Sequence, residues 1–270
     1  MIIDVSIHNG AIDWSQVKNS GVEGAIIRVG YGRDLTKQDD ARFKENIEGA
    51  ISNGLRVGAY IYSYAKSEDS ARSEAAHILR LVEPYKANIS LPLYLDLEEA
   101  GTERGAKERA VIFGDIIEAA GYWCGIYASE YWFKTHLNGL NRFTKWVASW
   151  GANNGTPNNK PSIEGSFDLW QYTSKGRISG IRGDVDLSEL LRSEVKGYVG
   201  TGEPAPSPTP VNPEPIAAPS YIEYKIKKGD TLSKIAKSYG VSVQAIKDAN
   251  PDKIKNVNKI YAGDVIRIPR

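Results

Sequence analysis

The sequence has very few residues of the types that link a fold covalently or through a metal. Its 270 residues include one cysteine, Cys124, which excludes an intrachain disulfide framework. The only histidines are His8, His77 and His136, and three scattered histidines with one cysteine argue against a zinc site. We therefore expect a disulfide-free protein with no metal and no cofactor.

Long apolar runs and a large net charge are also missing. No run approaches the roughly 18 apolar residues of a membrane span, so we expect no membrane insertion. The first residues, Met1 to Asp4, lack the basic stretch and apolar core of a secretory signal. A net charge of +1 gives no global reason to expect nucleic acid as a partner. The 41% hydrophobic and 25% charged residues are typical of a soluble globular protein.

Proline is concentrated in one segment. Residues 199–220 hold seven of the thirteen prolines and no lysine or arginine, which is typical of an extended, semi-rigid linker. Residues 1–198 carry 23 basic and 26 acidic residues, a net charge of −3, whereas residues 221–270 carry 11 and 5, a net charge of +6. The near-neutral total therefore conceals a mildly acidic body and a basic tail.

Short β-rich runs recur through residues 1–198, with helical patterns between the early ones. Apolar residues at helical spacing predict amphipathic helices over residues 43–51, 71–82 and 110–120, each followed by a glycine or proline. Alternation of strands with helices predicts a parallel sheet with right-handed crossovers. About eight strands in under 200 residues favour a small α/β barrel, with short or missing helices after Tyr127, over an open doubly wound sheet. The strand runs are residues 2–5, 25–29, 56–62, 93–97, 123–127, 146–148, 169–172 and 185–187.

Acidic residues lie at the ends of three of these strands. Asp4 lies near the end of the first strand, Asp96 and Glu98 end the fourth, and Asp184 and Asp186 flank the last. Residues two apart on a strand share a face, so the members of each pair point the same way. Barrel enzymes carry catalytic groups at strand ends. A single acid there could cap a loop, but desolvation of a carboxylate cluster is costly, which favours a functional site.

A carboxylate cluster without metal ligands suits the cleavage of a glycosidic bond. One carboxyl group protonates the leaving oxygen while an anion stabilises an oxocarbenium-like transition state, and like-charged neighbours raise the pKa of the acid. Aromatic residues near the same strand ends could stack on sugars, and we expect Tyr62, Tyr127 and Trp150 to bind substrate, with core packing as the alternative. Residues i and i+2 on a strand are about 6.6 Å apart. This separation lies between those of retaining and inverting glycosidases, so the stereochemical outcome stays open.

Seven motifs together resemble the family-25 glycoside hydrolases, the N-acetylmuramidases often found as phage and bacterial lysozymes. They follow the family's order: DVSIHNG, AIIRVGYG, GAYIYSY, YLDLE, VASW, WQYT and DVDL. The resemblance implies a flattened, irregular TIM-like (β/α) barrel and cleavage of the MurNAc-β-1,4-GlcNAc bond of bacterial peptidoglycan.

The same resemblance implies roles for individual acids. It makes Glu98 the general acid and Asp96 the carboxylate that orients or stabilises the N-acetyl group of the substrate. Asp4 and Asp186 match the flanking acids of the family. Asp184 precedes Asp186 on the same face and is the second choice for that position.

Residues 221–270 predict a small βααβ unit. Strand runs at residues 224–226 and 265–268 bracket two short amphipathic helices, the first closed by Gly240 and the second closed before Pro251. The runs YKIKKGDTLSKIA and IYAGDVIRIP resemble the LysM module. That resemblance implies binding of N-acetylglucosamine-containing glycan through two loops, and the residues expected to contribute are Gly229, Asp230, Thr231, Leu232, Asn250 and Ile254. The basic residues serve either solubility or attraction to acidic wall polymers.

The sequence thus predicts a modular peptidoglycan hydrolase: a muramidase barrel over residues 1–198, a linker over residues 199–220 and a wall-binding LysM module over residues 221–270. Without a secretory segment, we expect an endolysin that stays in the host cytoplasm until lysis and then acts on the cell wall. One alternative is a non-catalytic wall-binding protein, for which one of the acids should be missing. A chitinase-like hydrolase is disfavoured because only Asp96 precedes Glu98 in the strand YLDLE.

Overall fold

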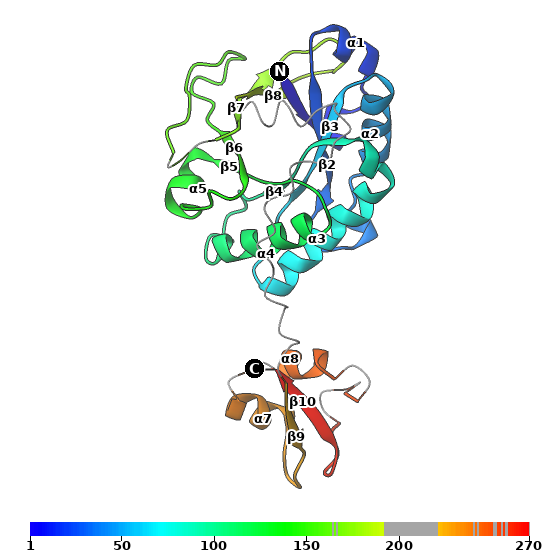
Figure 1. Cartoon of the computed structure of the whole chain (residues 1–270), viewed down its shortest axis with the longest axis vertical. Helices are drawn as coiled ribbons and strands as arrows, with labels where there is room; N and C mark the ends of the chain where they lie inside the picture. The colour runs from blue at the N-terminus through cyan, green and yellow to red at the C-terminus, as the bar shows by residue number, and fades with distance from the viewer. Residues whose placement is uncertain are drawn as a thin grey trace. The chain divides into compact units, whose positions relative to one another are not determined.

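The chain forms two compact units, Met1–Ala205 and Pro206–Arg270 (Figure 1). The computed structural model describes residues 1–163, 165, 167–191, 221–239, 241, 243–250, 253–254, 256 and 259–269. The predicted linker, residues 199–220, lies outside the described residues.

Eight strands close into a barrel in the larger unit, as the strand runs predict. Each strand pairs with its neighbour in sequence, and the last pairs with the first, which excludes the open sheet. In chain order they are β1 (Ile2–Val5), β2 (Gly24–Tyr31), β3 (Arg56–Tyr62), β4 (Ile89–Asp96), β5 (Cys124–Ser129), β6 (Thr144–Ala148), β7 (Leu169–Gly176) and β8 (Val185–Leu190).

The prediction of an all-parallel sheet is wrong for one strand. Strands β1 to β7 run parallel to one another, whereas β8 is antiparallel to both β7 and β1. The physical reason is the connection: only residues 177–184 separate β7 from β8. A parallel crossover needs about a dozen residues or more, while an antiparallel pair can be joined by a short loop.

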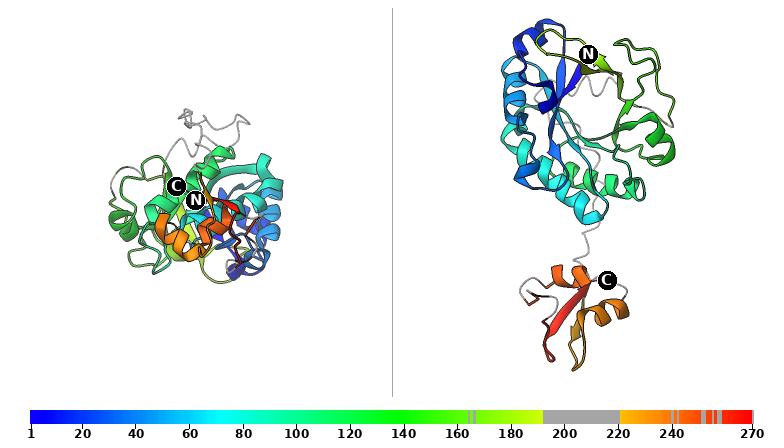
Figure 2. Two further views of the ribbon diagram at one scale, coloured as in Figure 1. Left: turned by 90° about the horizontal axis from the view of Figure 1, so that it is seen from below. Right: turned by 180° about the vertical axis from the view of Figure 1, so that it is seen from behind.

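Helices cover one side of the barrel. The predicted helices are present as α2 (Phe43–Ser52), α3 (Glu68–Val82) and α4 (Ala106–Ala119), which lie along the β2–β5 side (Figures 1 and 2). The six-residue helix α1 (Trp14–Asn19) was not predicted, whereas α5 (Glu130–Thr135), also of six residues, is one of the short helices expected after Tyr127. Between β6 and β8 the described residues form loops and no helix, as expected. No described helix combines the length and the apolar character needed to span a bilayer.

Strand alternation divides the apolar residues of the barrel into an outer and an inner core. Outward residues such as Ile3, Leu95 and Leu97 pack against the helices. The inner core centres on Trp146, whose ring centroid lies 5.0 Å from that of Tyr94 and 4.5 Å from that of Tyr127. This aromatic plug fills the barrel interior, so the space left for chemistry is at the end where β1 to β7 terminate, which we call the mouth.

The smaller unit has the predicted βααβ order. Strand β9 (Tyr221–Lys225) pairs antiparallel with β10 (Val265–Pro269), and α7 (Leu232–Tyr239) and α8 (Val243–Asp248) lie between them in sequence (Figure 1). Its small core consists of Ile226, Leu232, Ile235, Ala236, Ile246, Ile254, Ile266 and Ile268.

Candidate active site

The reversed direction of β8 brings two acids together at the mouth. Asp186 is the second residue of β8 and is paired in register with Asp4 of β1. If β8 ran parallel to β1, its second residue, Asp186, would lie at the opposite end of the barrel from the mouth. Asp184 is exposed and forms an ion pair with Arg177 at 2.8 Å. The structure therefore places Asp186, and not Asp184, against Asp4.

Asp96 and Glu98 complete a group of four acids. Asp96 is the last residue of β4 and is 4% exposed, and Asp4 is 6% exposed. Glu98 follows the strand and is exposed at the mouth. The charges of Glu98, Asp4 and Asp186 all act on Asp96. The four predicted acids therefore form one electrostatic cluster, which we call the acid cluster.

Burial and mutual repulsion favour protons on the acid cluster. Burial, followed by the charge of Asp186, raises the pKa of Asp4 well above its usual range. Burial likewise raises the pKa of Asp186 to about 6, although a side-chain hydrogen bond with Asp4 lowers it. For Asp96 the pKa rises because of burial and then the charge of Glu98. For Glu98, whose side chain reaches solvent, the pKa rises because the surrounding mouth partly desolvates the carboxyl group, and then because of the charges of Asp186 and Glu99. All four carboxyl groups therefore retain a proton to a higher pH than isolated carboxyl groups do.

Gln171 on β7 connects the acid cluster to two predicted aromatic residues. Its Oε1 accepts hydrogen bonds from the Tyr127 hydroxyl at 2.9 Å and from the Trp150 indole N–H at 3.0 Å, while its Nε2 donates to Asp4 at 3.0 Å. Sequence reasoning missed Gln171. The available signal was its place between Trp170 and Tyr172, which face outward, because alternation then turns Gln171 inward.

The predicted aromatic residues differ in what they offer a substrate. Trp150 is 39% exposed, whereas Tyr127 is 6% exposed and packs on Trp146. Tyr62 is half-buried and donates its hydroxyl hydrogen to Glu99 at 3.0 Å. Trp150 and Tyr62 therefore present surface at the mouth, whereas the buried Tyr127 contacts Gln171 through its hydroxyl.

Two further features of the acid cluster bear on its chemistry. Asp96 Oδ1 is buried without a hydrogen-bond partner, whereas most buried polar atoms have one. The charge of Arg28 lowers the pKa of Asp96, after the larger opposing effects of burial and nearby acids, while Arg28 itself forms an ion pair with Asp40 at 2.8 Å. Among the described residues, no group of three or more histidine, cysteine or acidic side chains is arranged to hold a metal ion.

In the small module, three of the predicted binding residues are internal. Leu232 and Ile254 are 2% exposed and Asn250 is 5% exposed. Asn250 donates from Nδ2 to the carbonyl groups of Ile246 and Arg267 at 2.7 and 2.6 Å, and it accepts from the Arg267 N–H at 2.8 Å. These side chains therefore build the two loops, and a ligand would meet the loop backbone and exposed neighbours.

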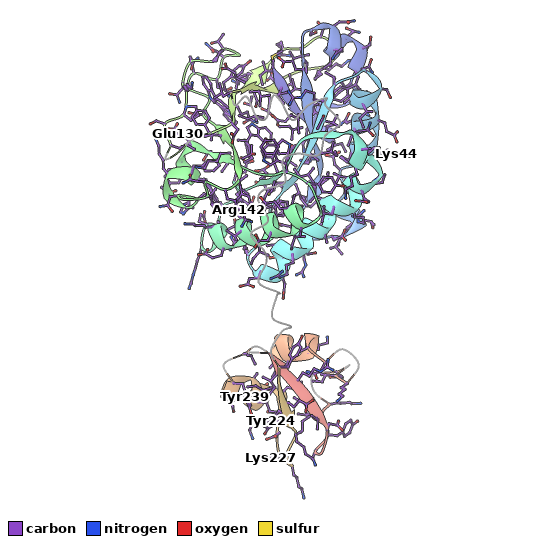
Figure 3. The ribbon with its side chains drawn as sticks, viewed as in Figure 1. Lys44, Glu130, Arg142, Tyr224, Lys227 and Tyr239 are labelled. Carbon is purple, nitrogen blue, oxygen red and sulfur yellow. The ribbon has the colours of Figure 1, made fainter. Side chains whose placement is uncertain are left out.

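The loop before α7 is also held by its own polar groups. Asp230 accepts from the Tyr224 hydroxyl and from the Lys227 N–H, both at 2.8 Å, and Thr231 accepts from the Lys234 N–H at 3.3 Å. Figure 3 shows Lys227 extending from the end of this turn, away from the module. Gly229 and Thr231 are exposed in the same turn.

Each of the two units matches a known protein family. The model of glycosyl hydrolases family 25 matches residues 3–181, and that of the LysM domain matches residues 224–269. The autolytic lysozyme of Clostridium acetobutylicum is 27% identical over 196 residues, which cover 72% of this chain and 57% of that protein, so the chain spans little more than half of this relative.

Two solved structures share the barrel. The catalytic domain of endolysin ply40 from bacteriophage P40 of Listeria monocytogenes is 29% identical, with a TM-score of 0.64 over 73% of this chain and 95% of that one. The modular autolysin LytC of Streptococcus pneumoniae, solved with a synthetic peptidoglycan ligand, is 28% identical, with a TM-score of 0.58 over 69% of this chain and 45% of that one.

Proposed function

The chain belongs to glycosyl hydrolases family 25, and from this premise we propose that it is a lysozyme that cleaves the MurNAc-β-1,4-GlcNAc bond of bacterial peptidoglycan. The observation that carries the proposal is the acid cluster of Asp4, Asp96, Glu98 and Asp186 beside exposed aromatic rings at the mouth. The LysM module would hold the enzyme on the same polymer.

Glu98 is the proposed proton donor. It is the one member of the acid cluster that is exposed at the mouth, where a bound sugar is reached. Its raised pKa keeps a proton available for the leaving oxygen. Transfer of this proton as the glycosidic C–O bond breaks leaves a neutral sugar hydroxyl and the Glu98 carboxylate.

Asp96 is the proposed partner of the substrate's N-acetyl group. Its unpartnered Oδ1 would accept the N–H of that group, which satisfies a buried oxygen and increases the electron density on the acetyl oxygen. The acetyl oxygen then attacks the anomeric carbon as an internal nucleophile, and water opens the resulting ring with retention of the β anomer.

Asp4 and Asp186 are proposed to tune the charge of the acid cluster. A hydrogen bond links their carboxyl groups, so the pair shares a proton, and Gln171 fixes the orientation of Asp4. This arrangement limits the negative charge beside Asp96 and Glu98 before the positive transition state forms.

The alternative, a wall-binding protein without turnover, needs a missing acid. All four predicted acids are present, and they converge on one cluster. Accumulation in a host cytoplasm before lysis stays a prediction.

Mass analysis of purified walls digested by the full-length protein tests the proposal. We expect fragments whose new reducing end is N-acetylmuramic acid. Fragments that end in reducing N-acetylglucosamine would indicate a glucosaminidase, and undigested walls would favour the alternative without turnover.

A further inference from the structure

A separate cavity lies beside the acid cluster, between the loop after β2 and the start of α3. Its volume is about 360 Å³, within the range of small-ligand sites. The side chains that define it are Arg33, Gln38, Tyr64, Lys66, Ser67 and Glu74.

The cavity carries two cations that the described part of the chain holds in no ion pair. Arg33 and Lys66 are both exposed, and neither forms an ion pair with another described residue. By contrast, nearby Arg80 is held by Asp34 and Asp39, each at 2.7 Å. The charge of Lys66 lowers the pKa of Glu103, but neither Lys66 nor Arg33 is held in a direct ion pair by the residues described, so both can contact an anionic ligand.

The one acid in the lining is already bound by groups of the loop after β3. Glu74 is fully buried and accepts hydrogen bonds from the Ser63 hydroxyl at 2.7 Å and the Tyr64 N–H at 2.9 Å. Burial raises the pKa of Glu74 to about 7, so its negative charge is reduced near neutrality. The cavity consequently has a net positive character.

A run of aromatic rings connects the cavity to the acid cluster. Tyr64 lines the cavity, and its ring centroid lies 5.1 Å from that of Tyr62, whose hydroxyl binds Glu99 beside Glu98. On the same side, the Lys66 ammonium lies next to Gly101, three residues after Glu98. A short chain that branches from a sugar at the mouth would therefore cross Tyr62 and Tyr64 and enter the cavity.

One wall of the cavity, at Gly32, is held in place by hydrogen bonds. The fully buried His77 contacts the carbonyl oxygen of Gly32 at 3.1 Å and the Asp39 carboxylate at 2.8 Å. Gly32 has φ of 61°, and its N–H donates to the carbonyl of Tyr62. A preformed wall lowers the ordering cost of binding.

We propose that this cavity binds the acidic peptide stem of the glycan, with Arg33 and Lys66 receiving its carboxylates. The assignment rests on the proposed function, because the peptide is attached to the muramic acid residue next to the bond to be cleaved. Charge-assisted hydrogen bonds to carboxylate are among the stronger polar contacts, and an arginine guanidinium can make them in pairs.

The test compares soluble glycan oligomers that carry peptide stems with the same oligomers after removal of the stems. The full-length Arg33→Gln, Lys66→Gln double variant should lose about tenfold in the preference for stem-bearing oligomers, read as the ratio of the two KM values, with kcat on stem-bearing oligomers retained. Lys44→Gln is the matched control, since Lys44 lies on the outer side of α2 (Figure 3) and should leave the ratio at the wild-type value. An unchanged ratio in the double variant overturns the proposal.

Calorimetry with the free stem peptide separates this proposal from the proposed function, because it needs no turnover. Wild-type protein should bind the peptide, and the double variant should bind it at least tenfold more weakly. Tight binding of a teichoic acid fragment by the cavity in place of the peptide would assign Arg33 and Lys66 to a different anion and refute the stem assignment. If the wild type cleaves neither oligomer yet binds the peptide, the proposed function fails and the cavity assignment survives.

Discussion

The barrel and the LysM module differ in how far their charged side chains are buried and paired. The barrel buries acids at its mouth, and ion pairs hold many of its surface cations, such as Arg80 and Arg142. In the described part of the module no ion pair forms, although eight cationic side chains are seen there, and the acid Asp230 is committed to a turn. Charge in the barrel is therefore organised for chemistry, whereas the positive charge of the module is available to an outside polymer.

The largest effect should come from the exposed acid of the cluster. Glu98→Gln removes the donor proton but keeps the shape, so lysis of walls should fall by about 10²- to 10⁴-fold while the thermal unfolding temperature is retained. Asp115→Asn is the matched control, since Asp115 is exposed on α4 and paired with Arg142, and its charge acts on none of the four cluster acids. Turbidity clearance measures both, and rapid clearance by a folded Glu98→Gln protein would remove the mechanism.

Asp96→Asn should be nearly as damaging, because the amide cannot increase the electron density on the acetyl oxygen as a carboxylate does. NMR of freshly formed wild-type products should show the β anomer. Initial release of the α anomer would rule out participation of the N-acetyl group.

Removal of the LysM module tests whether the module anchors the enzyme on the cell wall. Residues 1–198 alone should cleave soluble oligomers at the full-length rate, whereas lysis of intact walls at low enzyme concentration should fall by about tenfold or more, because the tether raises the local concentration. Added salt should narrow this gap, since screening weakens exposed charge attraction. A pull-down of residues 221–270 on purified walls provides the direct measurement, and a fragment that stays in the supernatant contradicts the anchoring role.

Gln171→Leu should have an intermediate effect that links structure to activity. It leaves the Tyr127 hydroxyl without a partner and frees the Asp4 carboxyl group, so we expect a loss of about 1–3 kcal/mol in the free energy of unfolding. Activity should fall with it, by about tenfold. Chemical denaturation and oligomer cleavage together check this, and unchanged stability would show that the hydrogen bonds of Gln171 carry little net free energy.

The smallest effect is a contrast in how stability depends on pH. Burial raises the pKa of Glu74 from 4.5 to about 7, so the folded barrel binds more protons than the unfolded chain between these values. The contribution of Glu74 to the free energy of unfolding is therefore present in full below about pH 4.5 and is lost as the pH rises through about 7. Its size is at most about 3 kcal/mol. Glu74→Gln should flatten that dependence in thermal unfolding across pH 5–8, and an unchanged slope would exclude Glu74 as the source.

The module should respond in the opposite direction. The Lys227 N–H and the Tyr224 hydroxyl lower the pKa of Asp230, so its contribution is present at neutral pH and is lost as the pH falls through the folded value. Asp230→Asn in the isolated module should weaken this acid sensitivity.

The sequence predicted best what depends on local periodicity. The two-residue repeat of a strand was enough to turn Asp4 and Asp96 inward and Leu95 and Leu97 outward. The sequence did not predict the roles of Gln171 and Glu74, because their hydrogen-bond partners lie in distant segments. The partners of Gln171 are on β1, β5 and the loop after β6, and those of Glu74 are in the loop after β3. Burial of Leu232, Asn250 and Ile254 likewise follows from packing that a motif does not display.

The pairing of β1 with β8 means that the acid cluster is assembled from the first and last strands of the barrel. A nascent chain that has emerged through β7 carries Asp4, Asp96 and Glu98 but lacks Asp186, and its β1 and β7 edges are still unpaired. Such open edges invite pairing with other chains. A copy of the chain that ends before β8 therefore lacks Asp186 and leaves the edges of β1 and β7 open, and only the full set of eight strands assembles the acid cluster.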